Sequence, residues 1–299
     1  MVLFKLLGGV AHGATAVLIW RLLAHKETAV RTARSLLWAW NPALLLFFVT
    51  DAHNDALMIF WLVLGYEVMV SKRPFLGFLI MVLGVLTKPI GLLVLPFFFL
   101  AEARQLATWP ERGLFLAKTA VGSLLLTTLA FLPFGSPLDL ATRLLSEASA
   151  GGGFSPIVFV ILLVRGLGGS VSLTLLSPIA LGLFGITAVW FMWAVWQNGR
   201  SATRSSAAIF IAYIFQALNF RIWYVTWPFA WLLLDEDPNH NRRLKYGFWL
   251  LLTAQLSVLI HGHLRVYALG QDHFWGHMIG VPFTFALPFL LSQWQRRET

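Results

Sequence analysis

Residues 41–58 read Asn-Pro-Ala-Leu-Leu-Leu-Phe-Phe-Val-Thr-Asp-Ala-His-Asn-Asp-Ala-Leu-Met. This stretch decides the fold because it places an Asp-x-His-Asn-Asp cluster, at positions 51–55, between two apolar runs. An ionisable residue near the hydrocarbon of a membrane costs about 3 kcal/mol or more unless it faces protein, water or a substrate. The cluster therefore predicts a functional site at the boundary of a membrane protein.

The composition of the whole chain supports that class. Of its 299 residues, 58% are hydrophobic and only 12% are charged, which leaves too little polar surface for a soluble protein. Repeated apolar runs of membrane-spanning size predict an all-α, polytopic helical protein, with residues 1–299 forming a single transmembrane domain. The formal charge of +9 fits basic cytoplasmic loops, and we expect no nucleic-acid partner. The absence of cysteine excludes disulfides and thiolate catalysis.

Hydropathy and charge together predict a topology. About eleven spans are expected from the span-length rule. They lie near residues 3–23, 35–50, 55–70, 75–87, 89–101, 114–133, 172–197, 206–219, 223–235, 245–262 and 277–294. Of the 22 Lys and Arg residues, 16 then fall on one side and six on the other, which places the larger group in the cytoplasm. We expect an integral protein of a bacterial-type cytoplasmic membrane, with the N-terminus outside, the C-terminus inside and the 51–55 cluster outside.

Residues 134–166 are predicted to form a loop on the outer face. Ser136-Pro137-Leu138-Asp139 is typical of a helix start, and apolar residues follow at helical spacing. This short amphipathic helix is either a lid or a connector that rests on lipid. Residues 156–166 are interpreted as a re-entrant or interfacial segment.

Two helical hairpins, 75–87/89–101 and 206–219/223–235, are too short for a full crossing. Arms of about 13–14 residues reach only about 20 Å across a hydrocarbon layer of about 30 Å. Their outer turns, which carry Lys88 and Arg221, are therefore predicted to form an outer-face recess. Cations held there attract an anion such as a lipid-linked phosphate. Alternatively, each cation extends to the interface or pairs with an acid such as Asp51.

The order of several motifs resembles a known family. The motifs are Asn41-Pro42, His53-Asn54-Asp55, Lys88-Pro89, Leu95-Pro96 and Trp223-Tyr224-x-x-Trp227-Pro228. In this order they resemble the polyprenyl-phosphate-sugar-dependent glycosyltransferases of the GT-C superfamily, and most closely the bacterial polyprenol-phosphomannose α-mannosyltransferases. The resemblance extends over roughly residues 3–101 and 206–235.

This resemblance implies an integral membrane glycosyltransferase. It would move a hexose, most simply mannose, from a polyprenyl-phosphate donor to a glycolipid or glycan acceptor on the extracytoplasmic face, with inversion. Lys88 and Arg221 would hold the donor phosphate, and His53, Asn54 and Asp55 would line the sugar or phosphate site. Trp223, Tyr224 and Trp227 would form an apolar wall for the sugar or prenyl chain.

The chain departs from the family pattern at its start. The family carries its catalytic acid on a first large outer loop, whereas this chain begins at what resembles the family's third span. We therefore expect a truncated form, a relocated base, or a non-catalytic membrane subunit or scaffold of a larger complex. Asp51 is the best local candidate for the base. Asp55 has a competing role, because together with Asn54 it is expected to cap the helix that follows.

Histidine and charge patterns near the C-terminus add further candidate residues for the substrate site. His261, His263 and Arg265 fall on the outer half and are predicted to contact the substrate. The spacings of His261 to His263 and of His273 to His277 also suit a divalent metal, although imidazoles suit a hydroxyl-rich substrate without one, and we expect no cofactor. Residues 235–237 with Arg242 and Arg243 are predicted to form a solvated cytoplasmic loop.

Overall fold

The computed structural model describes residues 2–134, 139, 142, 153–171, 173–237 and 240–294. Helices connected by short turns make up these residues, with no strand among them, which confirms the all-helical prediction. The α-helices are α1 (Val2–Leu22), α2 (Thr28–Ala39), α3 (Pro42–Leu44), α4 (Asp55–Val70), α5 (Pro74–Thr87), α6 (Leu95–Gln105), α7 (Trp109–Phe131), α9 (Pro156–Gly166), α10 (Leu173–Asn198), α11 (Ala202–Gln216), α12 (Trp227–Leu234), α13 (His240–Val258), α14 (Arg265–Tyr267) and α15 (His273–Trp294). Short 3₁₀ segments cover Pro89–Leu93, Leu132–Phe134 and Ile222–Thr226, and π-helical segments cover Leu45–Thr50 and Leu259–Leu264.

Within the part of the chain that the structure describes, five helical stretches are long and apolar enough to cross a membrane. They are Val2–Leu22, Trp109–Phe134, Leu176–Asn198, Asn241–Tyr267 and His273–Gln293. A sixth crossing arises if Thr28–Thr50 and Asp55–Val70 form one broken span, although the chain bends by 114° between them. The chain therefore has the character of a membrane protein, whereas the count of about eleven spans is not confirmed.

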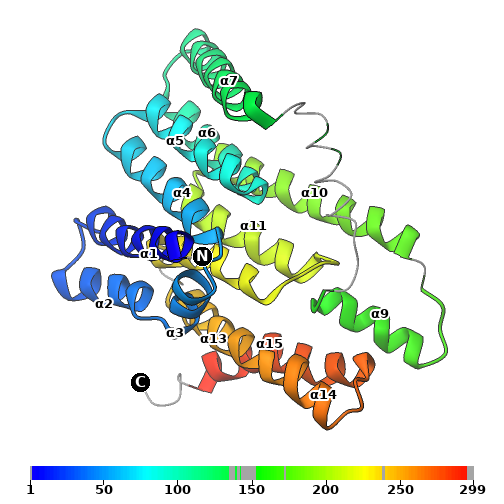
Figure 1. The fold of residues 1–299 in the computed structure, drawn as a ribbon. Helices are drawn as coiled ribbons and strands as arrows, with labels where there is room; N and C mark the ends of the chain where they lie inside the picture. Colours follow the sequence, from blue (N-terminus) through cyan, green and yellow to red (C-terminus); the bar gives the residue numbers. More distant parts are fainter. Residues whose placement is uncertain are drawn as a thin grey trace.

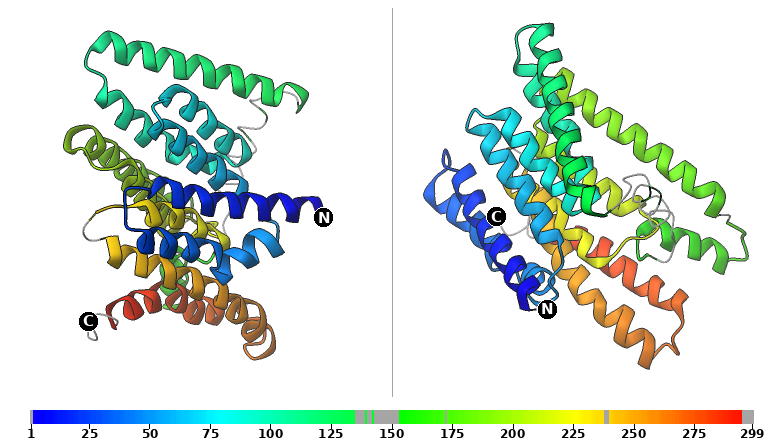
Figure 2. Two further views of the ribbon diagram at one scale, coloured as in Figure 1. Left: turned by 90° about the vertical axis from the view of Figure 1, so that its left-hand side faces the viewer. Right: turned by 45° about the horizontal axis from the view of Figure 1, so that its top comes forward.

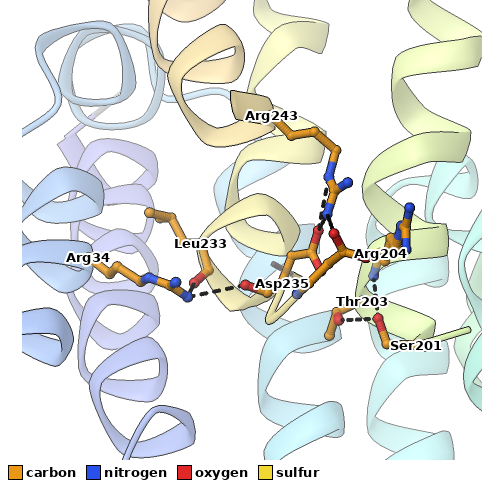
Figure 3. Close-up of polar contacts among 8 residues, drawn as sticks. Arg34, Ser201, Thr203, Arg204, Leu233, Asp235 and Arg243 are labelled. Atoms are coloured by element: carbon orange, nitrogen blue, oxygen red, sulfur yellow. Dashed lines mark hydrogen bonds and ion pairs between the residues drawn. The ribbon is translucent and has the colours of Figure 1, made fainter. Parts of the chain in front are cut away.

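The helices run back and forth in a roughly common direction, with α7 at one edge and α13 and α15 at the opposite edge (Figures 1 and 2). Ion pairs tie many of the helix ends together at one end of the bundle, which we call the basic end. Arg21 at the end of α1 pairs with Glu67 of α4 at 2.6 Å, and His25 pairs with Glu236 at 2.5 Å. Arg243 near the start of α13 pairs with Asp235 after α12, also at 2.6 Å (Figure 3).

A glycine contact holds the α4–α5 hairpin together. A Cβ atom added to Gly65 would lie 2.6 Å from the carbonyl oxygen of Gly77, so the two backbones touch where these glycines face each other. Small residues permit such close approach of helices in membranes. Because α4 begins at Asp55 and α5 ends one residue before Lys88, this contact fixes both side chains at the end opposite the basic end.

Buried aromatic residues join α12 to the N-terminal helices. Trp38 of α2 is fully buried, donates its indole N–H to the carbonyl of His12 at 3.0 Å and stacks on Phe229 of α12 at 6.4 Å. At the basic end, Arg34 donates to the carbonyl of Leu233 at 2.7 Å (Figure 3). Helix α12 is thus held at the centre of the bundle, with its first residue, Trp227, at the end that carries Asp55.

The predicted outer loop is described only in part. The expected amphipathic helix after Ser136 lies largely outside the described residues. Residues 156–166 form α9, a helix of 11 residues whose first turn is capped by the Ser155 side chain accepting from the backbone N–H of Val158. At about 16 Å this helix is too short for a full crossing, and its re-entrant or interfacial character stays a prediction.

Candidate functional site

The polar cluster begins where the helical backbone is interrupted before α4. The π-helical segment Leu45–Thr50 ends at Asp51, and Ala52 follows with φ at +58° in the left-handed region. Such a conformation costs a non-glycine residue about 1 kcal/mol or more, and both it and π-helical turns occur frequently at functional sites. The break turns the chain by 114° and delivers residues 51–55 to the end of the bundle.

The buried Asp55 and the partly buried Lys88 form an ion pair at the centre of the cluster. Asp55 is 0% exposed, and Lys88 Nζ lies 2.7 Å from its Oδ1 and 2.8 Å from its Oδ2. The indole N–H of Trp227, 172 residues further along the chain, also donates to Oδ1. The carboxylate therefore holds three elements together, and its charge is balanced by Lys88 and hydrogen-bonded by Trp227.

Aromatic rings surround the lysine. Lys88 Nζ lies 5.6 Å from the ring centre of Tyr224 and 5.4 Å from that of Trp227, within the range of cation–π attraction. These two rings stack on each other at 4.1 Å. Trp223 stacks instead on His53 at 4.4 Å, and the Nδ1 atom of His53 lies 4.0 Å from Asp55 Oδ2. The structure thus brings the Trp-Tyr-x-x-Trp motif against the His-Asn-Asp motif.

The remaining residues of the predicted site lie around this cluster. Asp51 is exposed at the break before α4, and Arg221 is exposed at the turn before Ile222–Thr226. The Asn54 side chain donates to the carbonyl of Thr87 at 3.5 Å, which ties it to the end of α5. Asp51 and Arg221 therefore have access to a ligand, whereas the Asp55 carboxylate does not.

One expectation about this cluster is wrong. Asn54 occupies the N-cap position of α4, but among the described residues its side chain makes no capping hydrogen bond, and Asp55 binds Lys88 instead. The alternative in which Lys88 pairs with a nearby acid is confirmed, with Asp55 rather than Asp51 as the partner. A lysine within reach attracts the carboxylate more strongly than the partial charges of a helix start do.

A second polar group lies on the π-helical segment Leu259–Leu264, on α14 and α15, and on the segment before α9. His261 is buried and lies 4.0 Å from Phe154 and 5.8 Å from His277, measured between ring centres. Neither of its ring nitrogens has a hydrogen-bond partner in the described part of the chain. Arg265 donates to the carbonyl of His261 at 2.8 Å, while His263 is exposed. These residues form a separate cluster, and no contact found among the described residues joins their side chains to Lys88.

A backbone contact connects the two groups, and the sequence reasoning did not foresee it. The N–H of Gly153 donates to the carbonyl of Leu218 at 2.9 Å, and the N–H of Phe154 donates to that of Phe220 at 3.2 Å. The Phe220 ring in turn contacts Tyr224 at 6.0 Å. A Cβ at position 153 would overlap the backbone of Phe220, so glycine is required there. The run of three glycines at 151–153 was the only signal for this contact in the sequence.

Metal ligation is not supported by the arrangement of side chains. Within the described ranges, no three His, Cys, Asp or Glu side chains are placed so that they could hold a metal ion. The His273 side chain lies 3.2 Å from Arg265, and the two ring nitrogens of His277 face the carbonyls of His273 and Gly153. These imidazoles therefore have hydrogen-bonding roles.

The Trp227 indole offers a direct test of the carboxylate cluster. We expect Trp227→Phe to lower the free energy of unfolding by about 1.5–3 kcal/mol more than Trp231→Phe does, because only the former removes a hydrogen bond to a charged group. Trp231 is equally buried, and its indole N–H has no acceptor among the described residues. Thermal or denaturant unfolding of both variants measures the difference, and equal losses would contradict the hydrogen bond to Asp55.

The fold and the cluster define a helical membrane protein with a buried ion pair and an aromatic-lined polar site at one end of its bundle. Residues 1–104, which include the 51–55 cluster and Lys88, match the family model described as alpha-(1->6)-mannopyranosyltransferase, N-terminal domain, of the MptA_B family. This match supports a mannosyltransferase family for about a third of the chain. No curated protein matches the chain.

Proposed function

We propose that this protein transfers mannose from a polyprenyl-phosphate donor to a hydroxyl of a glycolipid or glycan acceptor on the extracytoplasmic face of the membrane. The observation that carries the proposal is the junction of Asp55, Lys88 and Trp227, because it joins the part that matches a mannosyltransferase family to the Trp-Tyr-x-x-Trp motif. This junction forms one site from segments far apart in the sequence.

Lys88 is the proposed contact for the donor phosphate. An ammonium group has three N–H donors, and the two oxygens of Asp55 account for two of them. The Lys88 side chain is 21% exposed, so the third donor can reach a ligand while Asp55 holds the chain in place. A phosphate oxygen beside it gains charge during transfer, and a fixed cation stabilises that charge. Arg221, exposed at the neighbouring turn, is the second proposed phosphate contact.

Asp51 is the proposed general base. In the reaction the acceptor oxygen forms a bond to the anomeric carbon with inversion, and the bond from that carbon to the phosphate oxygen breaks. Polyprenyl phosphate leaves with the electron pair, and the acceptor proton passes to a carboxylate. Asp51 is exposed, whereas Asp55 already accepts from Lys88 and Trp227. His53 and Trp223, stacked beside Lys88, provide a surface for the sugar ring.

A non-catalytic membrane subunit or scaffold is the second candidate function. The observation that favours it is the completeness of the Asp55–Lys88–Trp227 cluster, in which the charge of the lysine is already balanced by a buried carboxylate. In this second candidate function, the role of the cluster is structural: it holds α4, α5 and α12 together.

One assay separates the two functions. The chain is reconstituted in vesicles with a radiolabelled polyprenyl phosphomannose donor and membrane glycolipid extract as acceptor, and transfer to the glycolipid fraction is counted. The proposal expects transfer that requires both donor and acceptor and that is absent from vesicles without the chain. If labelled product does not form while the protein is folded, the non-catalytic candidate holds.

A further inference from the structure

The basic end of the bundle carries a group of cavities that the proposed sugar transfer does not use. A cavity of about 350 Å³ lies beside α11, with Arg200, Arg204 and Arg243 at its charged side. Its other walls are apolar and come mainly from one face of α11, through Ala208, Ile211, Ala212 and Phe215, and from Leu232 of α12. A cavity with cationic side chains at one side and apolar side chains along the other is suited to bind an amphiphile.

The apolar wall continues along the bundle. Phe215 also lines a larger cavity of about 680 Å³ between α9, α11, α13 and α15. A smaller cavity of about 180 Å³ connects the two, since it shares Ile211 and Arg243 with the first and Tyr246 and Phe289 with the second. We call the three together the arginine groove. The arginine groove extends from the arginines of the basic end toward α9. A lipid acyl chain could therefore lie along it with its headgroup at the arginines.

The arginines carry more positive charge than the neighbouring acids balance. Asp235 accepts two hydrogen bonds from Arg243 (Figure 3). Asp237 pairs with Arg204 and with Arg243. The third acid, Glu236, is engaged by His25 and Lys26 on the other side of the turn. Asp235 is only 1% exposed, so the expectation of a solvated loop over residues 235–237 is wrong for this residue.

Of the three arginines that line the cavity, Arg200 is the one that these acids do not pair with. Within the described residues its guanidinium has no ion-pair or hydrogen-bond partner, and its Nε atom is buried. It lies over the Phe191 ring at 4.6 Å and over Trp190 at 5.7 Å. Burial, together with the charges of Arg204 and Arg243, lowers the pKa of Arg200 to about 10. An anion bound here would supply the missing partner.

We propose that the arginine groove binds a phosphate-headed lipid of net negative charge, with its phosphate on Arg200 and its chain along α11. The neighbouring cavity of about 590 Å³, which Arg200 shares with Ser201 and Thr203, gives room for a hydrated headgroup. Glu236 and Asp237 also line this cavity, but both are paired with other side chains. This site is distinct from the proposed donor site, because Trp227 at the start of α12 belongs to the donor site whereas the arginines surround the turn after its last residue, Leu234.

The test measures binding of short-chain phosphatidylglycerol to the full chain in neutral detergent by native mass spectrometry. Phosphatidylcholine of the same chain length and glycerol phosphate are the comparison ligands. We expect Arg200→Gln to raise the dissociation constant for phosphatidylglycerol by about tenfold, because a hydrogen bond to a charged group is lost. Ala212→Phe, which fills the apolar wall, is expected to weaken binding by a similar factor, and Ala208→Leu serves if that variant does not fold.

Arg112→Gln is the matched control. Like Arg200, Arg112 lies over two aromatic rings, those of Trp109 at 4.9 Å and Trp196 at 5.2 Å, but it does not line the arginine groove. Its replacement removes the same charge and is expected to leave phosphatidylglycerol binding unchanged. Equal weakening by Arg112→Gln and Arg200→Gln would overturn the proposal, and so would binding of glycerol phosphate as tight as that of the lipid. Insensitivity to the groove-filling variants would overturn it as well.

Discussion

Lys88→Ala is expected to abolish sugar transfer and to lower the free energy of unfolding by about 3–5 kcal/mol, because it leaves a buried carboxylate without its partner. Asp55 is 0% exposed, and without the ammonium group its carboxylate keeps only the hydrogen bond from Trp227 among those described. The donor phosphate would lose its proposed cation at the same time. Transfer of labelled mannose and thermal unfolding in detergent measure the two losses separately.

A double variant separates stability from function at this pair. In Lys88→Met with Asp55→Asn, no charge remains buried and the amide oxygen can still accept from Trp227, so most of the unfolding free energy is expected to return. Transfer is expected to stay absent because no cation remains at position 88. Lys5→Ala, which removes an exposed lysine near the start of α1, is the control. Recovery of transfer in the double variant would assign the pair a structural role only.

Helix positions were predictable from the sequence where hydrophobic length decides them. The spans expected near 55–70 and 75–87 correspond closely to α4 and α5, since apolar runs bounded by Ser-Lys-Arg-Pro and Lys-Pro define their ends. The break before α4 was expected, but its form was not. A π-helical segment followed by a left-handed alanine depends on packing around Leu45–Thr50 rather than on local propensity.

The members of the site were predicted better than their pairings. The sequence pointed to His53, Asp55, Lys88 and Trp227, which the structure brings together. It did not predict that Asp55 pairs with Lys88, because this contact joins helices whose separation is set by the facing glycines Gly65 and Gly77. The burial of Asp235 escaped prediction for a similar reason, since Arg34 of α2 reaches its backbone carbonyl from a distant part of the sequence. Contacts over such sequence distances depend on tertiary packing.

Asp51→Asn is expected to reduce transfer by roughly 10²–10⁴-fold, the usual contribution of a general base. The side chain is exposed, so the same change is expected to alter the free energy of unfolding by less than about 0.5 kcal/mol. The amide keeps the size of the carboxylate and removes only its ability to take the acceptor proton. The rate of transfer at saturating donor, together with thermal unfolding, distinguishes a lost base from a damaged fold.

Asp272→Asn provides the matched control, because Asp272 is also exposed and begins α15 by accepting from the N–H of Phe274 at 2.7 Å. Asparagine caps a helix about as well as aspartate does, so this variant removes one carboxylate charge without disturbing the fold. Transfer is expected to match that of the unaltered protein. If Asp51→Asn turns over at the same rate as Asp272→Asn, Asp51 is not the base. The proton acceptor would then come from another carboxylate, and the polar cluster would retain only the binding role that Lys88 and His53 support.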